Sequence, residues 1–306
     1  MNPPMIECQG LSHAYAGKLA LDNLSFNLNA GETVGLVGPN GAGKTTLLSV
    51  LSGFLIPSSG SVRILGQRPG SSALFGKVAA LPQDARLDPN FTIVEQLGFF
   101  ARLQGYTAKA AKHEAQRVLE LVALADIINA KPVALSHGMN KRVAIAQALI
   151  GQPKLVLLDE PTAGLDPLNA RNIRALIAEL VTETTFIISS HDLTELERLC
   201  QRILLLEHGE LHTDRQTHAT EVSDNYFITL HMDACPANLV IAEFSALPGV
   251  LEVVNRQKNE FIVRYQLQQQ PEMDISLLTC IKANHWQYRQ LIQGKSLEET
   301  LFSSFT

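Results

Sequence analysis

Hydrophobic residues in the first two thirds of the chain gather in short, mostly uninterrupted runs. Four of these runs predict buried strands, at residues 33–37, 155–158, 185–189 and 203–206. Strands without alternation between apolar and polar positions are typical of a parallel sheet that helices cover on both faces. We therefore predict an α/β fold for residues 1–215, with a turn at His208-Gly209 after the last run.

Helical periodicity occupies the region between the first and second runs. A helix is expected at residues 45–53, directly after the first buried strand. Residues 92–150 then contain only helical patterns, at 93–103, at 108–124 and after Ser136. This predicts a helical insert carried on the sheet, which ends where the buried run at residue 155 begins.

The pattern changes after about residue 223, where short alternating segments predict strands at 226–231, 250–255, 261–265 and 286–292. Helices are predicted between them, at 237–247 and 274–283. The order β-α-β-β-α-β predicts a small α+β accessory domain at residues 225–306, joined by a polar linker at 216–224. The sequence S-L-E-E at residues 296–299 predicts a capping box that opens a terminal helix.

The composition of the chain limits which binding partners and which cellular compartment are expected. The net charge of -5 argues against nucleic acid as the main partner, because phosphate backbones demand excess Lys and Arg. The 4 cysteines are widely spaced and are expected to be buried thiols in a reducing compartment. No export signal and no run of about 20 apolar residues is seen, so we expect a cytoplasmic protein that needs a partner to work at a membrane.

The segment after the first buried run has the residue types that bind phosphate. Gly38, Gly43, Lys44 and Thr45 match G-x-x-x-x-G-K-[ST] between a predicted strand and a predicted helix. Glycines let backbone N–H groups converge on phosphate oxygens, Lys44 can reach the β- and γ-phosphates, and the Thr45 hydroxyl can coordinate Mg²⁺. The predicted nucleotide-binding residues here are Gly38, Pro39, Asn40, Gly41, Ala42, Gly43, Lys44, Thr45 and Thr46.

Two carboxylates follow the second buried run, at the edge where open α/β sheets bind ligands. We expect Asp159 to hold the Mg²⁺ shell and Glu160 to act as general base on the attacking water. Taken alone, the pair could also be a solvated acidic turn before Pro161.

The sequence L-S-H-G-M-N-K-R at residues 135–142 resembles the L-S-G-G-Q signature of ATP-binding-cassette (ABC) transporters. The similarity to their ATP-binding subunits covers roughly residues 4–215 and implies a P-loop NTPase core of the ABC ATPase type. His137 replaces the first glycine of the signature and Met139 replaces the glutamine. Ser136 can still donate its hydroxyl to a phosphate, and the Gly138 N–H can approach one closely.

The resemblance implies roles for further residues. Tyr15 would stack on adenine, Gln83 would sense Mg²⁺ and the attacking water, and His191 would contact the γ-phosphate. From the residues alone, Tyr15 could equally be a half-buried strand residue, and His191 a surface histidine. The residues expected at a dimer interface are His137, Gly164, Leu165 and Asp166.

In the resembled family the glycine loop and the signature belong to opposite halves of a composite site. This implies a head-to-tail homodimer around two ATP molecules, whose hydrolysis drives a separate integral membrane permease. The permease would dock near Gln83 and the insert, where Leu97, Phe99 and Phe100 offer apolar contact unless they form the insert core. The ending at residues 296–302 resembles exporter-type subunits, which implies efflux of a drug, lipid or polysaccharide from the cytoplasmic face of the membrane.

Two other classes of protein share the glycine loop. A soluble ABC-type ATPase acting on a ribosome or another machine typically carries two cassettes in one chain, whereas one is present here. A GTPase needs N-K-x-D to bind guanine, and the sequence N-K-R-V at residues 140–143 lacks the aspartate. The small C-terminal domain could instead be a ligand-sensing module that regulates the ATPase.

Overall fold

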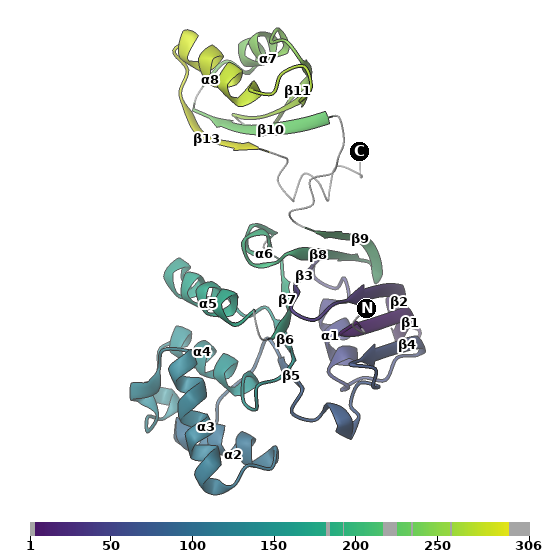
Figure 1. Cartoon of the computed structure of the whole chain (residues 1–306), viewed down its shortest axis with the longest axis vertical. Helices are drawn as coiled ribbons and strands as arrows, with labels where there is room; N and C mark the ends of the chain where they lie inside the picture. Colours follow the sequence, from purple (N-terminus) through teal and green to yellow (C-terminus); the bar gives the residue numbers. More distant parts are fainter. Residues whose placement is uncertain are drawn as a thin grey trace. The chain divides into compact units, whose positions relative to one another are not determined.

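The computed structural model describes residues 4–181, 184–191, 193–216, 225–233, 235–257 and 259–293. The chain divides into two compact units, residues 1–218 and residues 219–306 (Figure 1). The predicted linker beyond Gln216, the predicted terminal helix and the exporter-like ending lie outside the described residues.

The larger unit is organised by a six-stranded sheet in the order β5-β6-β7-β3-β8-β9. All neighbours are parallel except β9, which returns antiparallel to β8 after the turn at His208-Gly209. The strands are β3 (Thr33–Val37), β5 (Val78–Leu81), β6 (Leu155–Asp159), β7 (Thr185–Ser190), β8 (Arg202–Glu207) and β9 (Glu210–Gln216). The four predicted runs are therefore confirmed as β3, β6, β7 and β8.

A second, antiparallel sheet in the same unit was not predicted. It consists of β1 (Ile6–Tyr15), β2 (Lys18–Leu28) and β4 (Ser59–Ile64), in the order β2-β1-β4. The pairing of β1 with β2 shifts register three times, at the steps Cys8/Leu11, Leu11/His13 and His13/Ala14. These irregularities break the two-residue alternation that would have revealed the strand in the sequence.

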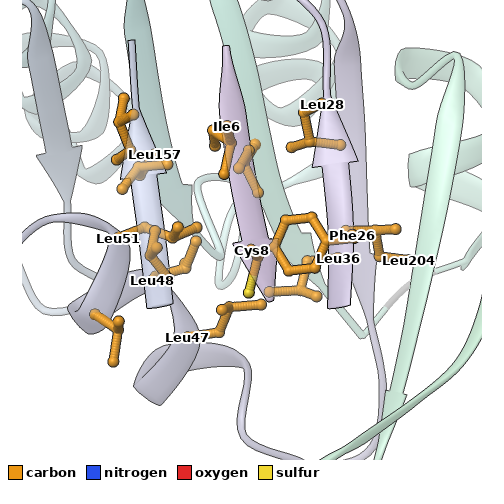
Figure 2. Packing of buried hydrophobic residues seen from close by; sticks show 14 of the residues in the cluster. Ile6, Cys8, Phe26, Leu28, Leu36, Leu47, Leu48, Leu51, Leu157 and Leu204 are labelled. Carbon is orange, nitrogen blue, oxygen red and sulfur yellow. The ribbon is translucent and has the colours of Figure 1, made fainter. Parts of the chain in front are cut away.

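Helix α1 (Lys44–Leu51) packs between the two sheets. Its side chains Leu47, Leu48 and Leu51 meet residues of both sheets, among them Cys8, Phe26, Leu36 and Leu157 (Figure 2). The helix ends at Leu51 and not at the predicted Gly53, whose φ of +80° is outside the helical region. Because α1 is held by its buried face, the position of the loop that precedes it is fixed as well.

The helical insert contains α2 (Ile93–Leu103), α3 (Ala108–Leu121), α4 (His137–Ala148) and the 3₁₀ turns η2 (Ala125–Ile127) and η3 (Pro132–Ala134). Thr92 and Glu95 form a reciprocal capping box at the start of α2. Helix α3 stops before the predicted residue 124, because Ala123 has a φ of +53°. Leu97 is fully buried and belongs to the insert core, so it is not available for a partner.

The remaining helices of this unit are α5 (Pro167–Leu180), α6 (Leu193–Leu199) and the 3₁₀ turn η1 (Ser72–Leu74). Figure 1 shows α5 and α6 on the side of the central sheet opposite α1 and the three-stranded sheet. Burial of Cys8 raises the pKa of its thiol from 9.0 to about 12, so this cysteine stays protonated even in mildly alkaline solution. Among the described residues, no helix combines the length and apolar character needed to cross a bilayer.

The second unit has the predicted element order. Its elements are β10 (Asn225–Met232), α7 (Ala237–Ser245), β11 (Val250–Gln257), β12 (Glu260–Gln266), α8 (Met273–Ala283) and β13 (Tyr288–Gln293). The sheet is antiparallel in the order β11-β12-β10-β13. Its own hydrophobic core includes Leu230, Phe244 and Phe261. The last strand begins after the predicted Trp286, whose ring packs edge-on against Phe244.

Candidate nucleotide-binding site

The loop between β3 and α1 passes so close to its neighbours that two of its positions exclude a side chain. A Cβ on Gly38 would lie 2.0 Å from the carbonyl oxygen of Leu206, and one on Gly43 would lie 2.5 Å from that of Ala20. Gly43 also has a φ of +108°. The pattern of glycines in the sequence is therefore explained by contacts with β8 and β2.

The first turn of α1 opens onto a pocket of about 180 Å³. The N-cap is Gly43, which has no side chain to accept hydrogen bonds from the first backbone N–H groups of the helix. These groups and the positive end of the helix dipole favour an anion. The pocket is lined by Ala20, Asn40, Gly41, Gly43, Lys44, Thr45, Thr46, Gln83, Asp159 and Glu160.

Lys44 is buried beneath the loop. Its Nζ donates to the carbonyl oxygen of Gly38 at 2.7 Å and to that of Pro39 at 3.2 Å. An ammonium group has three donors, and a phosphate oxygen attracts it more strongly than a neutral carbonyl does. The loop therefore holds a positive charge against the pocket, where it can interact with an arriving phosphate.

Asp159 and Thr45 meet in the same pocket from β6 and α1. The Thr45 hydroxyl donates to Asp159 Oδ2 at 2.9 Å, and the Ser189 hydroxyl donates to Asp159 Oδ1. The parallel register of β6 and β7 places Ser189 beside Asp159. A hydroxyl and a carboxylate side by side, with Gln83 in the same lining, form a set of hard oxygen donors that fits Mg²⁺.

Glu160 sits at a sharp change of direction after β6. Its φ is +50°, a left-handed conformation that costs a non-glycine residue about 1–3 kcal/mol. Its backbone N–H donates to Ser189 Oγ at 3.0 Å, and its Oε2 lies 2.7 Å from His191 Nδ1. The carboxylate is buried, whereas the His191 side chain is 66% exposed. The structure thus brings together Glu160 and His191, which the sequence placed separately.

Other predicted site residues lie outside this pocket as the structure describes it. Tyr15 ends β1, is 49% exposed and packs edge-on against His13 at 4.8 Å between ring centroids. Ser136 is the N-cap of α4, where its Oγ accepts from the Met139 N–H at 3.2 Å. Gly138 is buried, and a Cβ there would lie 2.6 Å from the Asn169 side chain.

The predicted interface loop adjoins the signature within one chain. Asp166 is the N-cap of α5, and its carboxylate accepts from two backbone N–H groups and, at 2.6 Å, from Asn169 Nδ2. Hydrogen bonds from Asn169 lower the pKa of Asp166. A Cβ on Gly164 would lie 3.6 Å from His137 Nε2, and Leu165 is half-buried beside it. His137 and Gly164 therefore belong to one continuous surface.

Sequence reasoning missed two polar residues that hold the segments around the site, namely Ser189 and Glu195. Glu195 is buried and accepts from Thr162 Oγ1 at 2.7 Å and from Ser190 Oγ at 3.2 Å. Glu195 therefore links Thr162, which follows Glu160, to Ser190, which directly precedes His191. The available signal in the sequence was the presence of hydroxyl side chains at the end of an otherwise apolar run. Which groups these hydroxyls bind depends on the register of the strands, which the sequence does not show.

Comparison with known proteins agrees with this geometry. The family model described as ABC transporter matches residues 21–163. The Nod factor export ATP-binding protein I of Burkholderia pseudomallei is 41% identical over 213 residues, which span 68% of this chain and 70% of that protein. The chain belongs to the ABC transporter family. A protein of the same name from Rhizobium leguminosarum bv. viciae is 37% identical over 223 residues, covering 72% of this chain and 71% of that one.

Solved ABC structures share the fold of the larger unit. An ATP-binding cassette in a dimeric post-hydrolysis state with ADP and Pi superposes with a TM-score of 0.64 at 26% identity, covering 70% of this chain and all of that one (100%). The protein cbiO1 from Clostridium perfringens, part of the ABC transporter complex cbiONQ, gives 0.63 at 27% identity and covers 71% and 90%. The predicted ABC ATPase core is confirmed, and this ABC subunit is an ATPase coupled to transport.

Proposed function

We propose that this ABC subunit hydrolyses ATP in the pocket between α1 and β6 and powers export through a separate permease. The observation that carries the proposal is the convergence of Lys44, Thr45, Asp159 and Glu160 on one small pocket. A phosphate-binding loop, an oxygen-rich cation site and a buried carboxylate at its edge are the three parts that phosphoryl transfer to water requires.

Within this pocket each residue has a distinct task. Lys44 and the first N–H groups of α1 bind the phosphates, and Thr45 with Asp159 and Gln83 would hold Mg²⁺. Bound Mg²⁺ supplies charge stabilisation to the phosphate oxygens. Glu160 accepts a proton from the water that attacks the γ-phosphorus, and His191, 2.7 Å from that carboxylate, holds it in place.

A dimer completes the site in this proposal. Ser136 and Gly138 stand at the start of α4, outside the pocket lining of their own chain. Their position beside Gly164 and His137 supports a surface that a second copy presents to bound ATP. One chain carries one copy of each half-site, so a homodimer with two ATP molecules uses every half-site once. The dimeric cassette among the related structures is consistent with this arrangement.

A groove of about 930 Å³ between the Gln83 side of the sheet and the insert is the proposed permease site. Its apolar lining includes Phe91 and Val94, and also Phe99 and Phe100, which the sequence had suggested for this contact. Leu97 is excluded because it is buried in the insert core. The remaining lining includes Leu81, Pro82, Arg86, Asp88, Glu95, Arg102, Lys112 and Gln147. Such an apolar groove with a mixed charged rim suits an amphipathic segment of a membrane protein.

Phe99→Asp tests this docking site. Phe99 is 58% exposed in the groove, and replacing an aromatic anchor by a charge is expected to weaken permease binding by at least about tenfold. The amount of permease that copurifies from detergent-solubilised membranes measures the effect. Leu121→Asp, at an exposed position of α3 outside the groove lining, is the matched control and should copurify normally. Equal copurification of both variants would contradict the proposed groove.

The direction of transport is proposed as export. The relatives from Burkholderia and Rhizobium are both named as Nod factor export ATP-binding proteins. We propose a peripheral subunit on the cytoplasmic face of the membrane, with a drug, lipid or polysaccharide as the exported substrate. ATP-dependent uptake of such a substrate into inverted vesicles that carry this chain and its permease would test the direction, and uptake into right-side-out vesicles instead would contradict it.

A chain that ends at Gln216 tests the role of the second unit. All residues that line the nucleotide pocket belong to the larger unit, and the second unit has its own hydrophobic core. The shortened chain is therefore expected to retain ATP hydrolysis within about twofold of the full chain. Phosphate release from the two purified proteins makes the comparison. Loss of hydrolysis in a folded, shortened chain would contradict a purely regulatory or docking role.

A further inference from the structure

Helix α4 carries a second functional group, Lys141, one turn beyond the signature residues at its start. Lys141 Nζ donates to the backbone carbonyl oxygen of Gln83 at 3.0 Å. Gln83 lines the nucleotide pocket of the same chain, whereas Ser136 caps α4 outside that pocket. Figure 1 shows α4 among the insert helices beside the central sheet. One helix therefore connects the signature with the Gln83 loop.

The surroundings of Lys141 act on its ammonium group in two opposite ways. The side chain is half-buried, and this burial lowers its pKa, while the charges of Asp84, Asp159 and Glu160 act in the opposite direction. Two of these three carboxylates are the pair at the end of β6. Lys141 thus brings a positive charge close enough to interact with Asp159 and Glu160. It also donates a hydrogen bond to the backbone of Gln83, which lines the pocket.

We propose that Lys141 is a positioning residue that fastens the Gln83 loop to α4 and so links the two ATP sites of a dimer. When a second copy presents its ATP to Ser136 and Gly138, α4 is held in place, and the hydrogen bond to the Gln83 carbonyl holds Gln83 at the pocket of this chain. The inference rests on the proposed function, in particular on the roles of Gln83 and of the signature residues.

Substitutions of Lys141 differ in how much of its contact with the Gln83 carbonyl they preserve. Arg has the length and charge to donate to the same carbonyl oxygen, so Lys141→Arg should preserve the link. Met has a similar apolar stem and no donor, so Lys141→Met removes the hydrogen bond and the charge while it keeps most of the packing. Lys109, on the exposed side of α3, provides the matched control Lys109→Met.

Steady-state ATP hydrolysis by the full chain tests the proposal. In Lys141→Met the kcat should fall about tenfold, the loss that follows removal of one hydrogen bond from a charged donor, with KM within about twofold. The Hill coefficient for ATP should fall from about 2 in the natural chain towards about 1, the limits for two linked and two independent sites. Lys141→Arg should recover at least about half of the kcat, and Lys109→Met should match the natural chain.

A second set of variants shows whether Lys141 acts through Gln83. Because the effect passes through the Gln83 loop, Lys141→Met should add little to the loss in a Gln83→Ala background. The inference alone is overturned if Gln83→Ala lowers kcat but Lys141→Met does not, or if the Hill coefficient is 1 in the natural chain or unchanged in Lys141→Met. It is also overturned if Lys141→Arg loses as much activity as Lys141→Met, with an equal fall in Tm. Hydrolysis that survives Gln83→Ala would overturn the proposed role of Gln83 and, with it, the inference.

Discussion

Glu160→Gln is expected to lower kcat for ATP hydrolysis by about 10² to 10³, within the range that a positioned general base contributes. Gln has the same shape and can keep a contact with His191 Nδ1, which lies 2.7 Å from Oε2 of the natural residue. It cannot accept the proton of the attacking water. Both residues meet the same conformational cost at a φ of +50°, so the backbone there should be retained.

The same substitution should leave ATP binding intact and prolong the ATP-bound dimer. With hydrolysis blocked, ATP stays between the two copies and stabilises their association by mass action. Size-exclusion chromatography with ATP should show a dimer for Glu160→Gln and a mainly monomeric natural chain once its ATP is consumed. Glu179→Gln, at an exposed position of α5, is the control. Hydrolysis at the natural rate in Glu160→Gln would remove Glu160 from the role of base.

Lys44→Ala is expected to raise the Kd for ATP by at least about 100-fold. The ammonium group is buried under the loop and supplies hydrogen bonds that now go to the carbonyl oxygens of Gly38 and Pro39. In the complex these donors would turn to phosphate oxygens, and each charge-assisted hydrogen bond is worth about 1.5–3 kcal/mol. Two of them amount to at least about 100-fold in Kd, at about 1.4 kcal/mol for each factor of ten.

Isothermal titration with ATP measures this loss directly. Removing Lys44 also leaves two carbonyl groups without their donor, so the loop could rearrange in the alanine variant. Lys44→Met keeps the aliphatic stem and its packing while it removes the charge and the hydrogen-bond donors, and it should bind ATP as poorly as Lys44→Ala. Lys109→Ala on the exposed side of α3 should bind normally. ATP affinity retained in both Lys44 variants would contradict the assignment of this loop to phosphate.

Much of the architecture could be predicted because it is encoded locally. The buried runs that became β3, β6, β7 and β8 each follow from a few neighbouring residues, and α2 begins and ends at the predicted residues. A hydrophobic period, a capping residue and a glycine at a turn act within one or two turns of chain. The glycine loop and the Asp159-Glu160 pair were found for the same reason, since their chemistry is contained in consecutive residues.

The arrangement of the site depended on contacts between distant parts of the chain. Only the register of β6 against β7 places Ser189 beside Asp159 and brings Glu160 to His191, and only the packing of α4 places Lys141 on the Gln83 carbonyl. The bulged sheet that supports the loop through Ala20 also escaped the periodic pattern. The sequence alone was enough to find four strands of the central sheet, the helices of the insert and the chemistry of the phosphate loop, because these are local properties. Which side chains meet could be seen only in the folded chain, because those distances are set by long-range packing and strand register that no local period encodes.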